Sequence, residues 1–383
     1  MVMSFGGPGN VTEPVEGHRR AKVLHLLVEA SEEEFAYNEL CLARASTHDM
    51  GVCTLLKSKV QVPETLRLYQ GDGSVRGFLS CLRKALSDAT YDVIHAHSPH
   101  VASLLLLSKL VPPTSPPAVF TVQHSYTNSN LNARNRLLDL LAFATFDRTV
   151  LVSEAARDSF PSIYRRLAGQ RLCVVPHAAD LARIDRTIKG SGDEALQSGF
   201  TVASVGRLIP IKNPETLLEA FLQERSPDAT LVLIGEGQLA GSLTRRAREA
   251  EAVESVRLTG LMPRDDVYRS LWAADLFVSA SLGEGMPVAV LEAMACRCPV
   301  ALSDIPSHRE IAADADFIPL FPPKDPNALA RQISRFRQMS NAMRREIGRR
   351  CRELVEDRYS LSTIHGRYDA IYRDLSYTPP PPG

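Results

Sequence analysis

Short apolar segments alternate with longer amphipathic segments along most of the chain. This alternation is typical of parallel strands that helices cover on both faces. The segments that we predict as strands are residues 23–28, 52–56, 92–97, 118–123, 149–153 and 172–176 in the first half, and residues 201–206, 230–235, 256–260, 275–281, 298–304 and 315–320 in the second. The segments with a helical pattern are residues 37–45, 75–89, 135–146, 213–223, 239–251, 264–273, 287–296, 327–355 and 361–375.

A polar, glycine-containing stretch at residues 182–198 separates the two alternations and predicts a linker. We therefore predict an α/β fold with two doubly wound, Rossmann-like domains that face each other across a cleft. The first domain is expected at residues 21–185 and the second at residues 199–360. Ligands of such sheets bind at the carboxyl ends of the strands, so both domains should present their loops to the cleft. Residues 1–20 are expected to form a loose leader, and the proline-rich residues 378–383 an extended tail.

The amino-acid composition argues against several classes of protein. The chain has 44 basic and 44 acidic residues among 383, and this balance argues against nucleic-acid binding through bulk charge. Its seven cysteines are an odd number scattered along the chain, so we predict a reducing compartment rather than a disulfide framework. No apolar run reaches the ~18–20 residues that span a bilayer. A cytoplasmic protein is the expected outcome.

The most informative stretch is residues 275–304, where a predicted strand leads into the loop GEGM at 283–286. A helix is expected to open at Pro287, because proline fits the first turn of a helix. The amides at such a helix start bind anions, and the helix dipole adds to this. The amides that we expect to be free for this purpose are those of Gly285, Met286 and Val288.

Two carboxylates frame this helix start, Glu284 in the loop and Glu292 eight positions later. At this spacing they suit the two ends of an extended ligand better than a coupled acid–base pair on one bond. Carboxylates accept hydrogen bonds from vicinal hydroxyls, which makes sugars natural ligands. Glu284 is alternatively an ordinary loop charge. Glu292 is surrounded by apolar residues in sequence and needs a partner in the fold.

Two cations lie in the loop that follows the strand at 201–206. Arg207 and Lys212 are five positions apart and could clamp a diphosphate, Arg207 as a fork and Lys212 as a point charge. Gly206 and, after the next strand, Gly235 would let a ligand approach the backbone closely. Without further context, arginine and lysine in loops are more often simply solvated.

The motifs above occur in a recognisable order. In the second half they read VGRLIPIKN, LIGEGQL, VRLTGLMPRDDV and SASLGEGMPVAVLEAMACRCPVALSDIPSHREI, and in the first half YDVIHAHSP, TVQHS, VLVSE and VVPHAAD. This order resembles the family 4 retaining glycosyltransferases of the GT-B fold, whose E-x7-E signature the two glutamates match. The resemblance is strongest over residues 199–320. It implies that the helix at residues 361–376 crosses back to the first domain.

The resemblance implies a role for each matching residue in binding a nucleotide-sugar donor. Arg207 and Lys212 are similar to the pair that holds the donor diphosphate. Glu292 is similar to the glutamate that binds the ribose hydroxyls, and Glu284 to the one that contacts the donor sugar. The backbone amides of Gly285, Met286 and Val288 would then form a cradle for the sugar and the phosphate.

The remaining implied roles concern the base and the reacting centre. Leu261 and Met262 lie where the backbone of this family meets the base. His124 matches a histidine near the donor sugar and the reacting centre, where it would donate a hydrogen bond or hold geometry. On the sequence alone, a histidine at a strand end that bonds to backbone is an equally good interpretation of His124.

The resemblance also implies a metal-independent reaction without a cofactor. Retention would proceed by front-face attack, in which the leaving phosphate takes the proton of the acceptor. The aspartates in the stretch 314–316 have the spacing of a metal-binding pair, but we interpret them as surface charge. The chain departs from the family pattern at residues 29–34, where an acidic loop replaces the usual glycine pair, and at His177 and Ala178, which replace asparagine and glycine.

We therefore expect a hexosyltransferase that uses a nucleotide-diphosphate sugar and a glycan or lipid-linked acceptor. The alternatives are a GT-B-shaped epimerase or phosphorylase, and a non-catalytic sugar-nucleotide-binding protein. The phosphorylase is disfavoured because no lysine lies in a context that suggests bound pyridoxal. Peripheral contact with the inner face of a membrane competes with the simpler interpretation of a solvated helix end. The residues that would make this contact are Arg165, Arg166 and Arg171 around Ile163, Tyr164 and Leu167.

Overall fold

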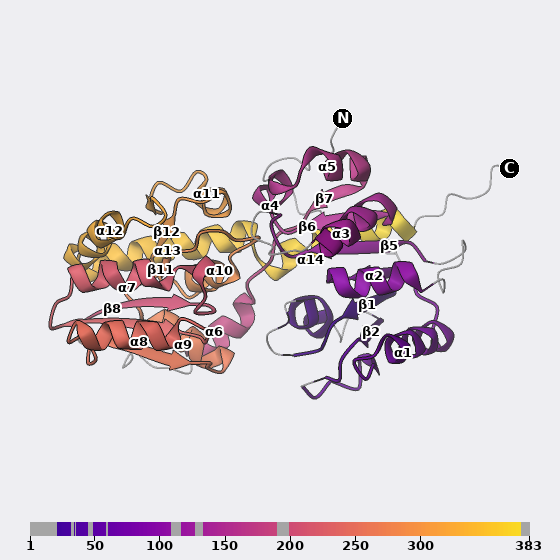
Figure 1. Cartoon of the computed structure of the whole chain (residues 1–383), viewed down its shortest axis with the longest axis horizontal. Helices are drawn as coiled ribbons and strands as arrows, with labels where there is room; N and C mark the ends of the chain where they lie inside the picture. Colours follow the sequence, from indigo (N-terminus) through magenta and orange to yellow (C-terminus); the bar gives the residue numbers. More distant parts are fainter. Residues whose placement is uncertain are drawn as a thin grey trace. The chain divides into compact units, whose positions relative to one another are not determined.

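The computed structural model describes residues 21–31, 34, 36–44, 49–58, 60–108, 116–126, 133–189 and 199–376. These residues form two compact units (Figure 1). The first unit runs to His177 and takes back the chain from Ser362 onward, and the second spans Ala178–Leu361. The predicted leader at 1–20, the tail at 378–383 and residues 190–198 of the predicted linker lie outside the described residues.

The first unit is built on a seven-stranded parallel sheet with the order β3-β2-β1-β4-β5-β6-β7. Its strands are β1 (Val23–Leu27), β2 (Met50–Thr54), β3 (Arg67–Gln70), β4 (Val93–Ala96), β5 (Ala118–Val122), β6 (Arg148–Leu151) and β7 (Leu172–Val174). All residues of β1, β2 and β4 are buried, which agrees with their continuous apolar sequence. The predicted doubly wound parallel sheet is therefore confirmed. We did not predict β3, because this edge strand is half exposed and its sequence does not look apolar.

Helices and turns connect these strands. They are η1 (Ala36–Cys41), η2 (Leu42–Arg44), α1 (Val75–Asp88), α2 (Pro99–Leu107), α3 (Ala133–Thr145), α4 (Glu154–Ser159), α5 (Ser162–Ala168) and η3 (Gly169–Arg171). Helices α1, α2 and α4 begin where Ser74, Ser98 and Ser153 each accept a hydrogen bond from the amide three residues later. Such N-caps satisfy amides that lack a partner inside the helix. The segment predicted as one helix at 37–45 is instead a π-turn followed by a 3-10 turn.

The last helix, α14 (Leu361–Ser376), packs against the sheet of the first unit. Tyr372 Oη lies 2.6 Å from His95 Nδ1, and Tyr368 Oη lies 3.4 Å from Thr121 Oγ1. In Figure 1 this helix passes behind the strands, with α2 and α3 in front of them. The predicted return of the C-terminal helix to the first domain is confirmed.

The second unit has a six-stranded parallel sheet with the order β10-β9-β8-β11-β12-β13. Its strands are β8 (Phe200–Val205), β9 (Ala229–Ile234), β10 (Val256–Gly260), β11 (Leu276–Ser279), β12 (Val300–Ser303) and β13 (Leu320–Phe321). Its helices and turns are α6 (Leu181–Lys189), η5 (Pro210–Lys212), α7 (Pro214–Gln223), α8 (Ala240–Glu249), α9 (Arg264–Ala273), α10 (Val288–Ala295), α11 (Pro306–Ala312), α12 (Pro326–Gln338) and α13 (Asn341–Arg358). A core of buried aliphatic and aromatic side chains joins this sheet to helices that include α7, α8 and α12.

Three predictions about this unit were wrong. Residues 182–189 form most of α6 rather than a linker, because Ile184 is buried and Asp185 pairs with the largely buried Arg352. The predicted single helix at 327–355 is two helices, because the Ser340 hydroxyl caps a new helix after α12 ends. The strand expected at 315–320 is reduced to the two residues of β13.

Candidate active site

Two loops of the second unit are joined at the carboxyl ends of adjacent strands. Strand β8 pairs with β11, so the loop after each strand leaves the same edge of the sheet. The Leu282 amide donates to the Ile211 carbonyl over 2.8 Å, and Asn213 Nδ2 donates to the Ala280 carbonyl over 3.1 Å. Asn213 is buried and has a φ of 52°, a backbone conformation that asparagine tolerates better than most residues. Sequence reasoning missed this role of Asn213.

An open pocket of about 450 Å³ lies between these loops. Four of its lining residues are ones that the sequence predicted as ligand-binding: Gly206, Arg207, Lys212 and Glu284. Sequence reasoning missed the hydroxyls of Ser204, Ser279 and Ser281, which line the same pocket. The pocket is therefore polar, with both signs of charge on its wall.

Glu284 and Lys212 form the charged centre of this pocket. Lys212 Nζ lies 2.5 Å from Glu284 Oε1, and the Ser281 hydroxyl donates to the same oxygen over 2.6 Å. The Glu284 side chain is 11% exposed and that of Lys212 is 27% exposed, so water screens this pair only in part. Two donors thus fix one oxygen of the Glu284 carboxylate.

Arg207 differs from Lys212 because, among the described residues, it has no acidic partner. The residue is exposed, and it makes no ion pair with any residue that the structure describes. Gly206 precedes it with a φ of 155°, and a Cβ at Gly206 would meet only the Lys212 side chain, at 3.8 Å. The backbone at the mouth of the pocket therefore stays open, with a cation beside it.

His308 supports the loop that carries Glu284 and was also missed from the sequence. Its Nε2 lies 3.2 Å from the Ser279 hydroxyl, and its Nδ1 lies 2.8 Å from the Ser303 carbonyl. The Ser303 hydroxyl in turn donates to the Ser281 carbonyl over 2.5 Å. Burial lowers the pKa of His308 to about 4, so the imidazole is neutral near pH 7.

Glu292 has the partner that its apolar surroundings require. Arg264 Nε and Nη2 donate to Glu292 Oε1 over 3.0 and 2.7 Å, and the Tyr268 hydroxyl donates to the same oxygen over 3.0 Å. Tyr268 is fully buried, and the Glu292 side chain is 10% exposed. Three donors thus converge on Oε1. The sequence could not reveal this cluster, because Arg264 and Tyr268 lie on another helix.

The start of α10 differs from the prediction. Pro287 is the residue before the helix, not its first residue, and the helix begins at Val288. The amide of Val288 donates to the Met286 carbonyl over 3.1 Å, so it is not free for an anion as we expected. The Met286 side chain is buried. Gly285 remains in the loop between Glu284 and this turn.

Gly235 is required by a close approach within the chain. A Cβ at this position would lie 2.2 Å from the Gly206 carbonyl oxygen, so two segments of the chain approach each other closely here. The predicted approach of a ligand to Gly235 stays a prediction. Leu261 and Met262 follow β10 directly. Leu261 is 65% exposed although it is aliphatic, which leaves an apolar side chain available at this edge.

His124 lies in the first unit, at the end of β5. Its Nε2 is 3.5 Å from Asp139 Oδ2, and Asp139 is 1% exposed. At this distance the two side chains make no hydrogen bond. A role for His124 at the reacting centre stays a prediction, as does the cleft between the two domains.

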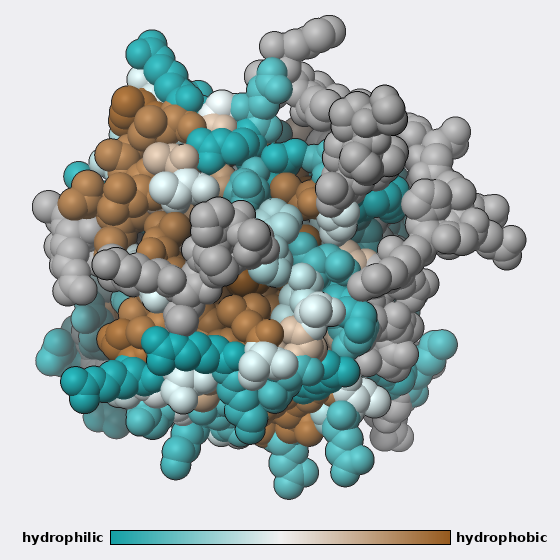
Figure 2. Space-filling view, turned by 90° about the vertical axis from the view of Figure 1, so that its right-hand side faces the viewer, coloured by the Kyte–Doolittle hydropathy of each residue, from teal (hydrophilic) through white to brown (hydrophobic). Residues whose placement is uncertain are grey.

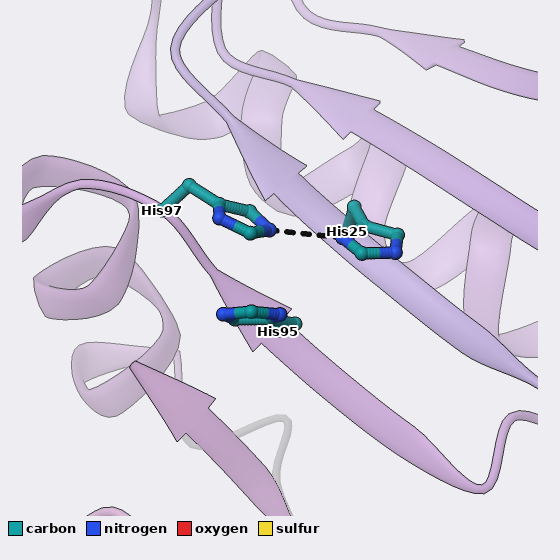
Figure 3. Close-up of side chains that lie close together, drawn as sticks. All are labelled: His25, His95 and His97. Carbon is teal, nitrogen blue, oxygen red and sulfur yellow. Dashed lines mark hydrogen bonds between the residues drawn. The ribbon is translucent and has the colours of Figure 1, made fainter. Parts of the chain in front are cut away.

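Three further histidines of the first unit form a buried cluster (Figure 3). His25 of β1 lies opposite His95 of β4, and His97 follows that strand. His25 Nδ1 lies 2.9 Å from His97 Nε2, and the rings of His95 and His97 are 3.8 Å apart. Burial, with a smaller effect of the neighbouring imidazoles, lowers the pKa of both His95 and His97.

Three clustered histidines are a common set of metal ligands, but the contacts of this cluster are hydrogen bonds to neighbouring side chains. Its ligand atoms lie within 4.8 Å of one another. However, the two ring nitrogens of His95 lie 2.6 Å from the Tyr372 hydroxyl and 2.7 Å from the Thr121 hydroxyl. A metal would have to displace one of these hydroxyls and separate the stacked rings. The geometry therefore favours a structural layer that ties α14 to the sheet.

The fold defines the class of the protein. Two parallel, doubly wound units with a returning C-terminal helix are the GT-B architecture. Similar solved structures are sucrose-phosphate synthase from Thermosynechococcus elongatus (TM-score 0.76, 17% identity, 93% of this chain and 99% of that chain) and HepE from Anabaena in complex with UDP and glucose (TM-score 0.73, 16% identity, 92% and 100%). At this level of identity the likeness shows the fold.

Sequence comparison relates the chain to known families. Residues 41–183 match the family described as "Glycosyltransferase Family 4", and residues 193–354 match "Glycosyl transferases group 1". The two matches lie in the two halves of the chain, and the resemblance to family 4 glycosyltransferases that the motifs predicted is confirmed.

Two curated relatives illustrate the range of the family. UDP-Gal:alpha-D-GlcNAc-diphosphoundecaprenol alpha-1,3-galactosyltransferase of Escherichia coli is 28% identical over 242 residues, which are 59% of this chain and 61% of that protein. Phosphatidyl-myo-inositol mannosyltransferase of Mycolicibacterium smegmatis is 25% identical over 308 residues, 77% of this chain and 74% of that protein. The chain thus spans about three fifths of the first relative.

Proposed function

We propose that the protein is a retaining, metal-independent glycosyltransferase. It transfers a hexosyl group from a nucleotide-diphosphate sugar to a glycan or lipid-linked acceptor in polysaccharide or glycoconjugate synthesis. The observation that carries the proposal is the pocket of the second unit, where Arg207, Lys212 and Glu284 meet at the carboxyl ends of β8 and β11. The printed activities of the relatives, one of which uses UDP-Gal and one of which is a mannosyltransferase, agree with this class of donor.

The two cations are suited to a diphosphate leaving group. Negative charge develops on the diphosphate as the bond to the sugar breaks, and fixed cations stabilise that charge without reorganisation. Arg207 is exposed at the pocket and can take a phosphate as a bidentate partner. Lys212 pairs with Glu284 and also lines the pocket. It would therefore contact the leaving phosphate while it holds the carboxylate that we assign to the donor sugar. These residues would supply the stabilisation that other enzymes obtain from a metal ion.

The two glutamates divide the recognition of the donor. Glu284 has one oxygen held by Lys212 and Ser281, which leaves the other oxygen for sugar hydroxyls. Glu292 has Oε1 held by Arg264 and Tyr268, and we assign its other oxygen, Oε2, to the ribose hydroxyls. Leu261 and Met262 would contact the base. His124 is assigned to the reacting centre on the resemblance alone.

We also propose that the protein works at a membrane surface. None of the helices within the described residues combines the length and the apolar character needed to cross a bilayer. Two relatives have names that include a lipid, diphosphoundecaprenol in one and phosphatidyl-myo-inositol in the other. Peripheral contact with the inner face of the membrane would bring such an acceptor within reach.

Nucleotide release from a panel of UDP-, GDP- and ADP-sugars, with and without membrane extracts as a source of acceptor, tests this function. We expect one donor to support acceptor-dependent release, and NMR of the product to show a retained anomeric configuration. Arg207→Ala and Glu284→Gln should each lose ~2.7–4 kcal/mol of transition-state stabilisation, which is ~10²–10³ in kcat/KM. Arg309→Ala, which removes an exposed partner of Asp304, is the matched control. Donor binding without turnover on any acceptor would instead support a non-catalytic binding protein.

A further inference from the structure

One wall of the pocket in the second unit is made by three polar side chains at the end of β11. Ser279 is the last residue of this strand, and Ser281 and Glu284 lie in the loop that follows it. All three line the pocket. We call these three side chains the β11 wall. A hydroxyl can donate or accept a hydrogen bond, whereas a carboxylate only accepts, so the positions of the two hydroxyl protons decide what the β11 wall offers to a ligand.

The neutral imidazole of His308 fixes the proton of Ser279. His308 is fully buried, and burial lowers its pKa to about 4, so the ring carries a single proton near pH 7. Its Nδ1 lies 2.8 Å from the Ser303 carbonyl, which can only accept, so this proton is on Nδ1. Nε2 is then a hydrogen-bond acceptor, and the hydroxyl that lies 3.2 Å from it is that of Ser279. The one proton of the Ser279 hydroxyl is therefore used on His308.

The proton of Ser281 is also used inside the protein. The Ser281 hydroxyl donates to Glu284 Oε1 over 2.6 Å, and Lys212 Nζ lies 2.5 Å from the same oxygen. The oxygens of Ser279 and Ser281 are 3.4 Å apart, which is at the limit of a hydrogen bond. Neither serine thus has a proton left for a ligand, and both present oxygen lone pairs to the pocket.

The β11 wall therefore has a uniform polarity. On the outer face that Figure 2 shows, hydrophilic and hydrophobic residues lie side by side. The three side chains of the β11 wall instead all act as hydrogen-bond acceptors toward the pocket. A ligand group with O–H or N–H protons can satisfy them, whereas a carboxylate or phosphate finds no donor among them and meets the charge of Glu284.

We propose that the β11 wall selects a neutral donor sugar over a uronic acid, and that His308 is the positioning residue that sets this preference. The proposal rests on the proposed function, which brings a nucleotide sugar into this pocket, and it adds the class of sugar. The hydroxyls of a neutral sugar would donate to the β11 wall. The diphosphate of the same ligand would be kept on the side of Arg207, which is exposed at the pocket.

Titration calorimetry with matched pairs of nucleotide sugars tests the proposal. Each pair shares its nucleotide and sugar ring and differs in a hydroxymethyl or a carboxylate group, as UDP-glucose and UDP-glucuronate do, or GDP-mannose and GDP-mannuronate. UDP, GDP and ADP are titrated first, and the one that binds most tightly selects the pairs. The wild type should bind the neutral member at least about tenfold more tightly, because a carboxylate at the β11 wall lacks a hydrogen-bond donor.

Two variants separate the role of His308 from a merely structural one. His308→Asn keeps an amide N–H for the Ser303 carbonyl but removes the acceptor at Nε2, so Ser279 can donate into the pocket. The preference for the neutral sugar should then fall by about threefold or more. Adding Ser279→Ala removes that donor again and should restore the wild-type preference, which no general loosening of the loop would do. Arg309→Ala is the matched control on the same helix, because Arg309 pairs with Asp304 at the surface.

Three results would overturn the proposal. The wild type could bind both members of each pair equally well, His308→Asn could keep the full preference, or the double variant could fail to recover it. The first of these decides the matter even where His308→Asn does not fold. The affinity for the nucleoside diphosphate alone is a separate readout. If UDP, GDP and ADP all fail to bind, the proposed function is wrong and this inference falls with it; if one of them binds and the pairs are not distinguished, the inference alone is wrong.

Discussion

Removal of the Arg264 guanidinium tests how the protein holds Glu292. In the structure Arg264 supplies two of the three hydrogen bonds to Glu292 Oε1, and it also donates to the Tyr268 hydroxyl over 2.8 Å. The side chains of Arg264 and Glu292 are only 18% and 10% exposed, so water screens their attraction little. Arg264→Ala leaves the carboxylate with one donor on this oxygen and free to turn.

The expected size of the effect follows from these contacts. Hydrogen bonds to charged groups contribute ~1.5–3 kcal/mol each, and part of this loss should appear in nucleotide affinity if Glu292 binds ribose. We predict that Arg264→Ala weakens nucleotide binding by about tenfold to a hundredfold, as ~1.4 kcal/mol corresponds to a factor of ten. Tyr268→Phe removes one donor and should weaken it less.

Titration calorimetry with the preferred nucleotide and its 2′-deoxy form gives the readout. The wild type should bind the 2′-deoxy form more weakly than the preferred nucleotide. In Arg264→Ala the difference between the two affinities should be smaller, since Glu292 is no longer oriented toward the ribose hydroxyl. Arg246→Ala is the matched control. It breaks a pair with Glu219 of similar geometry, but that pair is about 40% exposed and is expected to contribute little. The reasoning is refuted if Arg264→Ala binds both nucleotides as tightly and as selectively as the wild type.

Three further predictions concern turnover, stability and pH. Lys212→Ala should lower kcat by ~10²–10³ with a smaller effect on unfolding, because it removes a cation at the leaving group; steady-state kinetics with urea unfolding checks this. Arg352→Ala should lower the free energy of unfolding by ~1–3 kcal/mol, because it removes the hydrogen bonds to the Ala295 carbonyl and to Asp185, whose carboxylate is 42% exposed and can be solvated instead; an unchanged urea midpoint would contradict this. Burial lowers the pKa of His308 to about 4, below the ~6.5 of an unfolded histidine, so protonation favours the unfolded state. The contribution of His308 to the free energy of unfolding should therefore be fully present above pH ~6.5 and should fall toward pH 4 by up to ~1.4 kcal/mol per pH unit. In urea unfolding at pH 7.5 and 5.5, the free energy of unfolding of His308→Asn should change less between the two pH values than that of the wild type.

Much of the fold could be predicted because buried parallel strands are continuous apolar runs. Strands β8 to β12 were located to within about two residues on that basis, as were most strands of the first unit. The predictions of strands and helices failed where an element is only partly buried or where a side-chain hydrogen bond starts a new helix. Strand β3 is half exposed, and the hydroxyl of Ser340 starts a new helix inside a uniform helical pattern.

The candidate site could be predicted only where its residues lie in loops that directly follow predicted strands. Arg207, Lys212 and Glu284 follow strands at positions where parallel sheets bind ligands, and the structure brings them to one pocket. Asn213, Arg264 and His308 act through contacts with residues more than 20 positions away, so no local pattern marks them. The Val288 amide is a prediction that failed for a related reason. The sequence suggested that this amide was free to bind a ligand, but in the structure it donates to the Met286 carbonyl in a turn that the sequence did not reveal.

A crystal structure of the protein with the nucleoside diphosphate that binds most tightly tests the central claim most directly. The account predicts the diphosphate within hydrogen-bond distance of Arg207 and Lys212, and the ribose hydroxyls on Glu292 Oε2. A nucleotide bound elsewhere, with these side chains in the positions that they already occupy, would contradict it.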